Sequence, residues 1–132
     1  MRRTGPTQAV RDGVYFRDGF RCVICQDSDF LQIHHRRPRG MGGTRRESTN
    51  GAAGLLLLCE RCHSWVESQR DLARQRGFLV PQHTEPADVA LIHHGVWSWL
   101  ADDFTVTPLG ASDLAARDVL ISDTSGEQDG AA

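Results

Sequence analysis

Apolar residues along the chain alternate between helical and strand-like spacing, and this predicts the order of the elements. Val10 and Val14 are four residues apart and share one face of a helix, which Gly19 would end. Four consecutive leucines precede Cys59, and such a short unbroken run is typical of a buried strand. The first part of the chain is predicted to contain a helix over residues 8–17, strands over residues 30–34 and 55–58, and a helix from residue 60 to Gly77.

After Pro81 the pattern predicts a small β extension. Residues 89–92 and 96–100 favour two strands joined by a hairpin turn at His94-Gly95, and residues 104–107 favour a third. The rest is acidic and rich in Ala and Ser, which predicts a disordered tail with a helical turn or two over residues 114–121. We expect an α+β chain with an N-terminal arm and start of a helix, a central domain, a β extension and a tail, at residues 1–14, 15–80, 81–109 and 110–132.

Composition adds the need for a staple and hints at a partner. A chain of 132 residues with 39% hydrophobic residues builds only a marginal core. An additional stabilising element, here called a staple, is therefore expected, such as a bound metal or a disulfide. The net charge of −2 is unevenly spread, because residues 1–50 carry ten arginines and five acids, whereas residues 81–132 carry one arginine and nine acids. This asymmetry suggests a polyanion partner, although a solvated surface with a solubilising tail explains it equally well.

No apolar run is long enough to span a bilayer, and no signal peptide is visible. We therefore expect a cytoplasmic protein without a membrane partner. The sequence does not set its oligomeric state.

The staple is predicted to be a structural zinc ion. The four cysteines form two C-x2-C pairs, Cys22 with Cys25 and Cys59 with Cys62. Free thiols or two disulfides are the alternatives, but in a cytosolic chain such pairs favour a metal. Four thiolates fill all the positions of a tetrahedral zinc, so no position is left open for catalysis.

Three histidines lie inside or beside the cysteine pairs. His34 and His35 end a predicted strand, where neighbouring side chains point to opposite faces, so one can bind a metal while the other faces a substrate. His63 directly follows Cys62 in the first helical turn and can reach the same metal. The remaining histidines lack such a setting and are expected to be ordinary surface or core residues: His83, His93 and His94.

Four motifs stand together in this part of the chain: Cys-Val-Ile-Cys at 22–25, Ile-His-His-Arg at 33–36, Gly-Met-Gly-Gly at 40–43 and Leu-Leu-Leu-Leu-Cys-Glu-Arg-Cys-His at 55–63. In combination they resemble the HNH endonucleases, most closely the small HNH proteins of bacteriophages and actinobacteria. The resemblance covers roughly residues 15–77. It implies a ββα-metal (His-Me) finger that nicks or cuts double-stranded DNA by metal-dependent hydrolysis, with a phage terminase as a candidate partner in DNA packaging.

The resemblance also implies residue roles. His34 and His63 would hold one catalytic divalent metal (Mg²⁺, Mn²⁺, Ni²⁺ or Zn²⁺), and His35 would be the general base. Glu67, one helical turn after His63, is a weak further candidate for a ligand, and a solvated glutamate on the helix face is favoured there.

Two more expectations follow from the same resemblance. The chain departs from the family at Gly54, where relatives carry the asparagine that orients the base, and Asn50 is the nearby substitute. The DNA backbone would be bound by five arginines, Arg36, Arg37, Arg39, Arg45 and Arg46. The alternative functions are an inactive HNH-fold zinc module that binds DNA or protein, and a toxin-type nuclease, for which a delivery domain would be expected.

Overall fold

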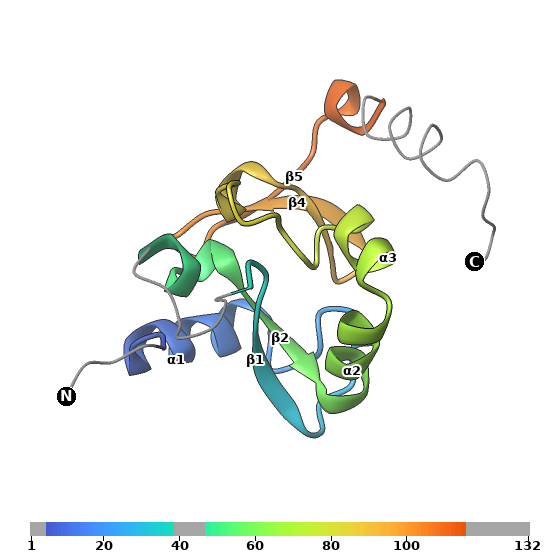
Figure 1. Cartoon of the computed structure of the whole chain (residues 1–132). Coiled ribbons are helices and arrows are strands. Elements are labelled where there is room, and N and C mark those ends of the chain that lie inside the picture. Colours follow the sequence, from blue (N-terminus) through green and yellow to red (C-terminus); the bar gives the residue numbers. More distant parts are fainter. Residues whose placement is uncertain (1–4, 39–46, 116–132) are drawn as a thin grey trace.

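The computed structural model describes residues 5–38 and 47–115, which form an α+β arrangement with two small sheets (Figure 1). The helices and strands are α1 (Gln8–Arg17), β1 (Leu31–His35), β2 (Leu55–Cys59), α2 (Glu60–Ser68), α3 (Arg70–Gln75), β3 (Leu91–His93), β4 (Val96–Leu100) and β5 (Val106–Pro108). Short 3-10 turns are η1 (Glu47–Asn50), η2 (Ala52–Gly54) and η3 (Pro86–Asp88). None of the helices in these ranges is long and apolar enough to cross a membrane.

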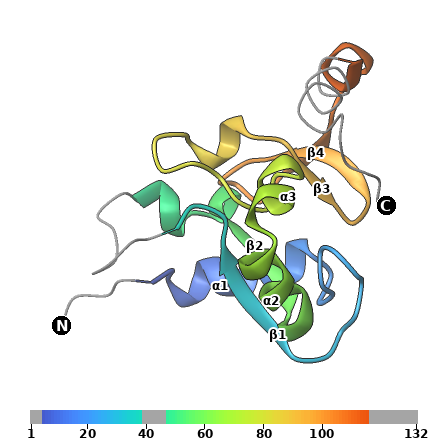
Figure 2. The same ribbon diagram turned by 45° about the vertical axis from the view of Figure 1, so that its right-hand side comes forward.

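The β1–β2 pair is the centre of the fold. The strands are antiparallel, with His34 opposite Leu56 and His35 opposite Leu55. All five residues of β2 are buried, as the leucine run predicted, because both α1 and α2 pack against this strand (Figures 1 and 2). Each fully buried leucine contributes roughly 2 kcal/mol of transfer free energy. The buried strand thus provides a stable base for the polar residues of β1.

The predicted helix from residue 60 to Gly77 is two helices, which is a correction. Gln69 leaves the helical conformation, with φ −119° and ψ 58°, and separates α2 from α3. The hydroxyl of Ser68 donates to the carbonyl of Trp65, 3.2 Å away, and such side-chain bonds compete with the helix ladder. Gly77 does end the second helix, at φ +82°, where an added Cβ would come within 2.1 Å of the Ala90 carbonyl oxygen.

The predicted β extension is present as a three-stranded antiparallel sheet in the order β3-β4-β5. His94 and Gly95 form the hairpin turn with φ of 48° and 84°, the positive values that a type I′ turn requires. The first strand starts later than expected, at Leu91, because Pro86 opens a 3-10 turn before it. Residues 111–115 are helical, and the tail beyond them lies outside the described residues.

Asp18, the residue that caps α1, connects this second sheet to the β1–β2 pair. Its buried carboxylate accepts hydrogen bonds from Arg17 at 2.7 Å, from the backbone N–H of Leu57 at 3.0 Å and from Nε2 of His93 at 2.8 Å. Its backbone carbonyl accepts from Nε2 of His94. Burial alone would raise the pKa of Asp18, but the bonds from His93 and Arg17 lower it overall. His93 and His94 therefore have structural roles, as expected.

Candidate metal centres and the histidine pocket

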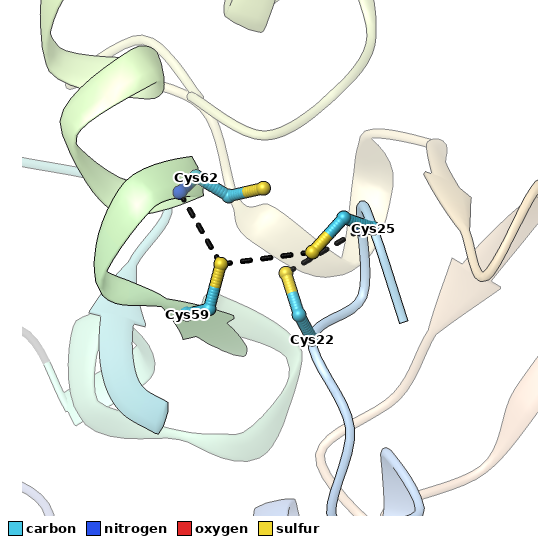
Figure 3. Close-up of side chains that lie close together, drawn as sticks. All are labelled: Cys22, Cys25, Cys59 and Cys62. Atoms are coloured by element: carbon cyan, nitrogen blue, oxygen red, sulfur yellow. Dashed lines mark hydrogen bonds between the residues drawn. The ribbon is translucent and has the colours of Figure 1, made fainter. Parts of the chain in front are cut away.

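The four cysteines come together from two parts of the fold (Figure 3). Cys22 and Cys25 lie in the loop after α1, whereas Cys59 ends β2 and Cys62 stands in the first turn of α2. None of the four forms a disulfide, and Cys25 is the one that reaches the surface. The cluster joins the loop to the start of α2.

The geometry of this cluster fits a tetrahedral metal. The sulfurs of Cys25 and Cys59 are 3.6 Å apart, and bonds of about 2.3 Å to a tetrahedral zinc would place two sulfurs about 3.8 Å apart. Backbone N–H groups also point at the sulfurs, from Cys25 to Cys22 at 3.5 Å and from Cys62 to Cys59 at 3.4 Å. Burial and the charge of Cys22 raise the pKa of Cys62, so a bound cation is needed to keep all the thiols ionised. The cluster can hold a metal ion.

A second group of possible ligands lies between β1 and α2. The candidate ligand atoms of His34, His63 and Glu67 all lie within 4.8 Å of one another, and the two imidazole rings meet edge to face at 5.1 Å. Period two along β1 brings His34 to the side that α2 covers, and the i,i+4 spacing on α2 aligns Glu67 with His63. The Glu67 carboxylate is exposed and can rotate toward a shared ion.

Each of the two imidazoles is already held in its orientation by a hydrogen bond to an oxygen, made by the ring nitrogen that would not bind the metal. Nε2 of His34 donates to the carbonyl of Phe78 at 2.8 Å, and Nδ1 of His63 donates to the amide oxygen of Gln32. The lone pairs are therefore on Nδ1 of His34 and Nε2 of His63, and metal-binding histidines are typically fixed in this way. Burial lowers the pKa of His34 to about 4, which keeps its ring neutral near pH 7. This group can also hold a metal ion.

His35 is bound to Asn50, the residue that the sequence offered in place of the missing asparagine. Nε2 of His35 lies 2.8 Å from Oδ1 of Asn50, which belongs to η1. Because the amide oxygen only accepts, Nε2 carries the proton and the lone pair is on Nδ1. Gly54 instead ends η2, where its carbonyl accepts from the N–H of Arg36.

A pocket of about 230 Å³ joins these groups. His34, His35, His63, Glu67 and Arg70 all line it. Neighbouring histidines at the end of β1 thus reach the same pocket. A ligand in this pocket would contact a neutral imidazole, an imidazole held by an amide, and a carboxylate.

The expected DNA-contacting role of Arg36 and Arg37 is wrong. The side chain of Arg36 is 0% exposed, and its guanidinium donates to the carbonyls of Ala53, Gly77, Pro86 and Val89. Arg37 is 1% exposed and donates to the hydroxyl of Thr49 and the carbonyl of Thr84. Unsatisfied carbonyls in the interior attract these donors, so neither group is available to phosphate. The other three arginines lie outside the described residues, at positions 39, 45 and 46.

Two residues of the site were missed in the sequence: Gln32, which holds the ring of His63, and Arg70, which lines the pocket. Gln32 shares the strand face of His34, so period two along β1 provided a signal for it. Arg70 lies three residues after Glu67, so helical spacing provided a signal for it as well.

Comparisons of the chain with protein-family models, with curated proteins and with solved structures found no significant match.

Proposed function

We propose that the protein is a metal-dependent endonuclease of the HNH type, which hydrolyses a phosphodiester bond of DNA in the histidine pocket. The observation that carries the proposal is the placement of His35. It is held by Asn50 and lines the same pocket as the His34, His63 and Glu67 group. The order β1, β2, α2, with the candidate ligands on β1 and α2, supports the proposal, because the same order is expected of a ββα-metal finger.

His35 is the proposed general base. Its Nε2–H is fixed by the amide oxygen of Asn50, so Nδ1 is the nitrogen that would accept a proton from the attacking water. Asn50 is a positioning residue, since it acts through the ring of His35. The His35–Asn50 hydrogen bond thus supplies the orientation of the base that Gly54, which has no side chain, cannot supply.

His34, His63 and Glu67 are the proposed ligands of the catalytic metal. A divalent cation there would supply electrostatic stabilisation of the charge that develops on the phosphate and on the leaving oxygen. Two imidazoles and a carboxylate fit Mn²⁺, Ni²⁺ or Zn²⁺, and Mg²⁺ less well. The cysteine cluster would hold a separate zinc ion with a structural role, because its four positions leave no place for water.

A plasmid-nicking assay tests the proposal. Pure protein is incubated with supercoiled plasmid and Mg²⁺, Mn²⁺ or Ni²⁺, beside His35→Ala, Asn50→Ala and the control His83→Ala, whose side chain is exposed. We expect metal-dependent nicking that falls by about 100-fold or more in His35→Ala, the usual worth of a general base, and by less in Asn50→Ala. His83→Ala should cut normally.

Absence of cutting with every metal, while DNA binding is retained, would favour the non-catalytic module instead. Equal nicking rates for wild type and His35→Ala would show that His35 is not the general base.

A further inference from the structure

Arg70 lines the histidine pocket, and it is the one arginine to do so in the part of the chain that the structure describes. Its Nη1 lies 3.1 Å from Oε1 of Glu67, and the other oxygen of the same carboxylate is 4.0 Å from Nε2 of His63. A single carboxylate thus stands between the guanidinium and a nitrogen of the candidate metal group.

We propose that Arg70 binds a backbone phosphate of DNA in this pocket, and that Glu67 competes with the phosphate for it. The identity of the ligand as DNA rests on the proposed function. The Arg70 side chain is 43% exposed and therefore within reach of a ligand, and its planar guanidinium matches two phosphate oxygens. Arg36 and Arg37 cannot serve, since their side chains are enclosed by the protein.

The competition follows from charge. The Glu67 carboxylate occupies Arg70 and also repels any anion that enters the pocket. An exposed ion pair of this kind contributes little free energy, so the carboxylate can turn away at low cost. A divalent cation at His34 and His63 would attract Glu67 and release Arg70 for the phosphate. Metal and phosphate should therefore each raise the affinity of the pocket for the other.

The chain offers a matched control on the same helix. Arg74 pairs with Asp71 at 3.2 Å, also three residues apart, and its side chain is 46% exposed. This pair carries the same charges but does not line the pocket. Any effect of net charge alone should therefore be equal at the two pairs.

Fluorescence anisotropy with a fluorescein-labelled DNA duplex tests the proposal, in buffer without added divalent metal. We expect Arg70→Gln to weaken binding about tenfold, as for loss of one charge-assisted pair, and Arg74→Gln to weaken it about twofold or less. Glu67→Gln should tighten binding several-fold, and Asp71→Asn should change it little. A purely structural role for the Glu67–Arg70 pair would give weaker or unchanged binding in Glu67→Gln. Equal effects at the two arginines, or no tightening in Glu67→Gln relative to Asp71→Asn, would overturn the proposal.

A second measurement locates the contact. In an NMR titration with inorganic phosphate, the Nε–Hε signal of Arg70 should shift, and the shift should grow when Zn²⁺ is added; an unmoved Arg70 signal contradicts the proposal. These outcomes are distinct from those of the plasmid assay. A protein that binds phosphate through Arg70 but never cuts DNA would refute the nuclease alone. A protein that cuts DNA while Arg70→Gln binds like Arg74→Gln would refute this inference alone.

Discussion

At the scale of single residues, the two nitrogens of His34 have different surroundings. One donates to the carbonyl of Phe78, and the other carries the lone pair on the side of the candidate metal group. Burial lowers the pKa of this ring to about 4, so protons do not compete with a cation near neutral pH. Gln32 fixes His63 in the same manner. The candidate ligands of the pocket are therefore preorganised, and a metal bound there should be separable from one bound by the cysteines.

We expect His34→Gln to remove one metal ion per chain and to leave the other. The glutamine amide can still donate to the Phe78 carbonyl, but it lacks the imidazole lone pair. With Co²⁺ as a probe, wild type should bind about two ions, and His34→Gln about one, with the thiolate-to-cobalt absorption of the cysteine cluster unchanged. His83→Ala is the control and should bind as wild type does. Loss of the thiolate absorption in His34→Gln, or two ions in both proteins, would contradict independent sites.

At the scale of elements, Arg36 connects segments that form no common sheet. Its four carbonyl acceptors lie between 17 and 53 residues away in the sequence, in or beside η2, α3 and η3. These carbonyls come from turns and helix ends, where the backbone has no ladder partner. A single guanidinium satisfies them all because its five N–H groups spread in one plane.

Arg36→Met should lower the free energy of unfolding by about 3 kcal/mol or more, since it leaves several buried carbonyls without a donor. Arg36→Lys should be destabilising as well, because a compact ammonium cannot span four separate acceptors. Urea unfolding followed by circular dichroism measures both, with the exposed Arg74→Met as control. A loss in Arg36→Met no larger than that of Arg74→Met would show that water replaces the guanidinium.

The elements and the site differ in how far the sequence predicted them. The hairpin turn at His94-Gly95 and the two cysteine pairs are local patterns, so short-range rules were sufficient for them. The buried position of Arg36 could not be predicted, because it depends on carbonyl acceptors in turns that are far away in the sequence. The resemblance implied a phosphate contact for Arg36, but this residue directly follows His35, so its side chain points to the opposite side of the strand and into the interior. Arg70 was missed although it lies three residues after Glu67, a spacing that brings side chains together on a helix.

At the scale of the whole molecule, Asp18 is the point where three parts meet. Its backbone N–H caps α1, and its carboxylate accepts from the backbone of β2 and from His93 of β3. The N–H of His94 adds a bond to the carbonyl of Val23, in the turn between Cys22 and Cys25. The second sheet is thereby attached to the same loop that carries half of the cysteine cluster, so the β extension should stabilise the centre of the fold.

The stability that this attachment contributes should depend on pH in a defined direction. The pKa of Asp18 is lowered in the folded protein, because the hydrogen bonds from His93 and Arg17 outweigh the effect of burial. An unfolded Asp takes up its proton near pH 4, whereas the folded Asp18 does so only at lower pH. The unfolded state therefore binds more protons in this window. The stability contributed by Asp18 is complete above about pH 4 and is lost as the pH falls through its folded pKa.

Asp18→Asn should therefore be less stable than wild type by about 2 kcal/mol at pH 7, and this gap should narrow as the pH falls below about 4. The neutral amide cannot accept on both of its terminal atoms, so at least one bond from Arg17, Leu57 or His93 is lost. Urea unfolding between pH 7 and pH 3, with zinc present throughout, measures the gap. Asp71→Asn, whose carboxylate is 95% exposed, is the control and should follow wild type across the range. A gap that stays constant down to pH 3 would mean that Asp18 acts through packing alone, since a paired carboxylate must lose its advantage when it takes up a proton.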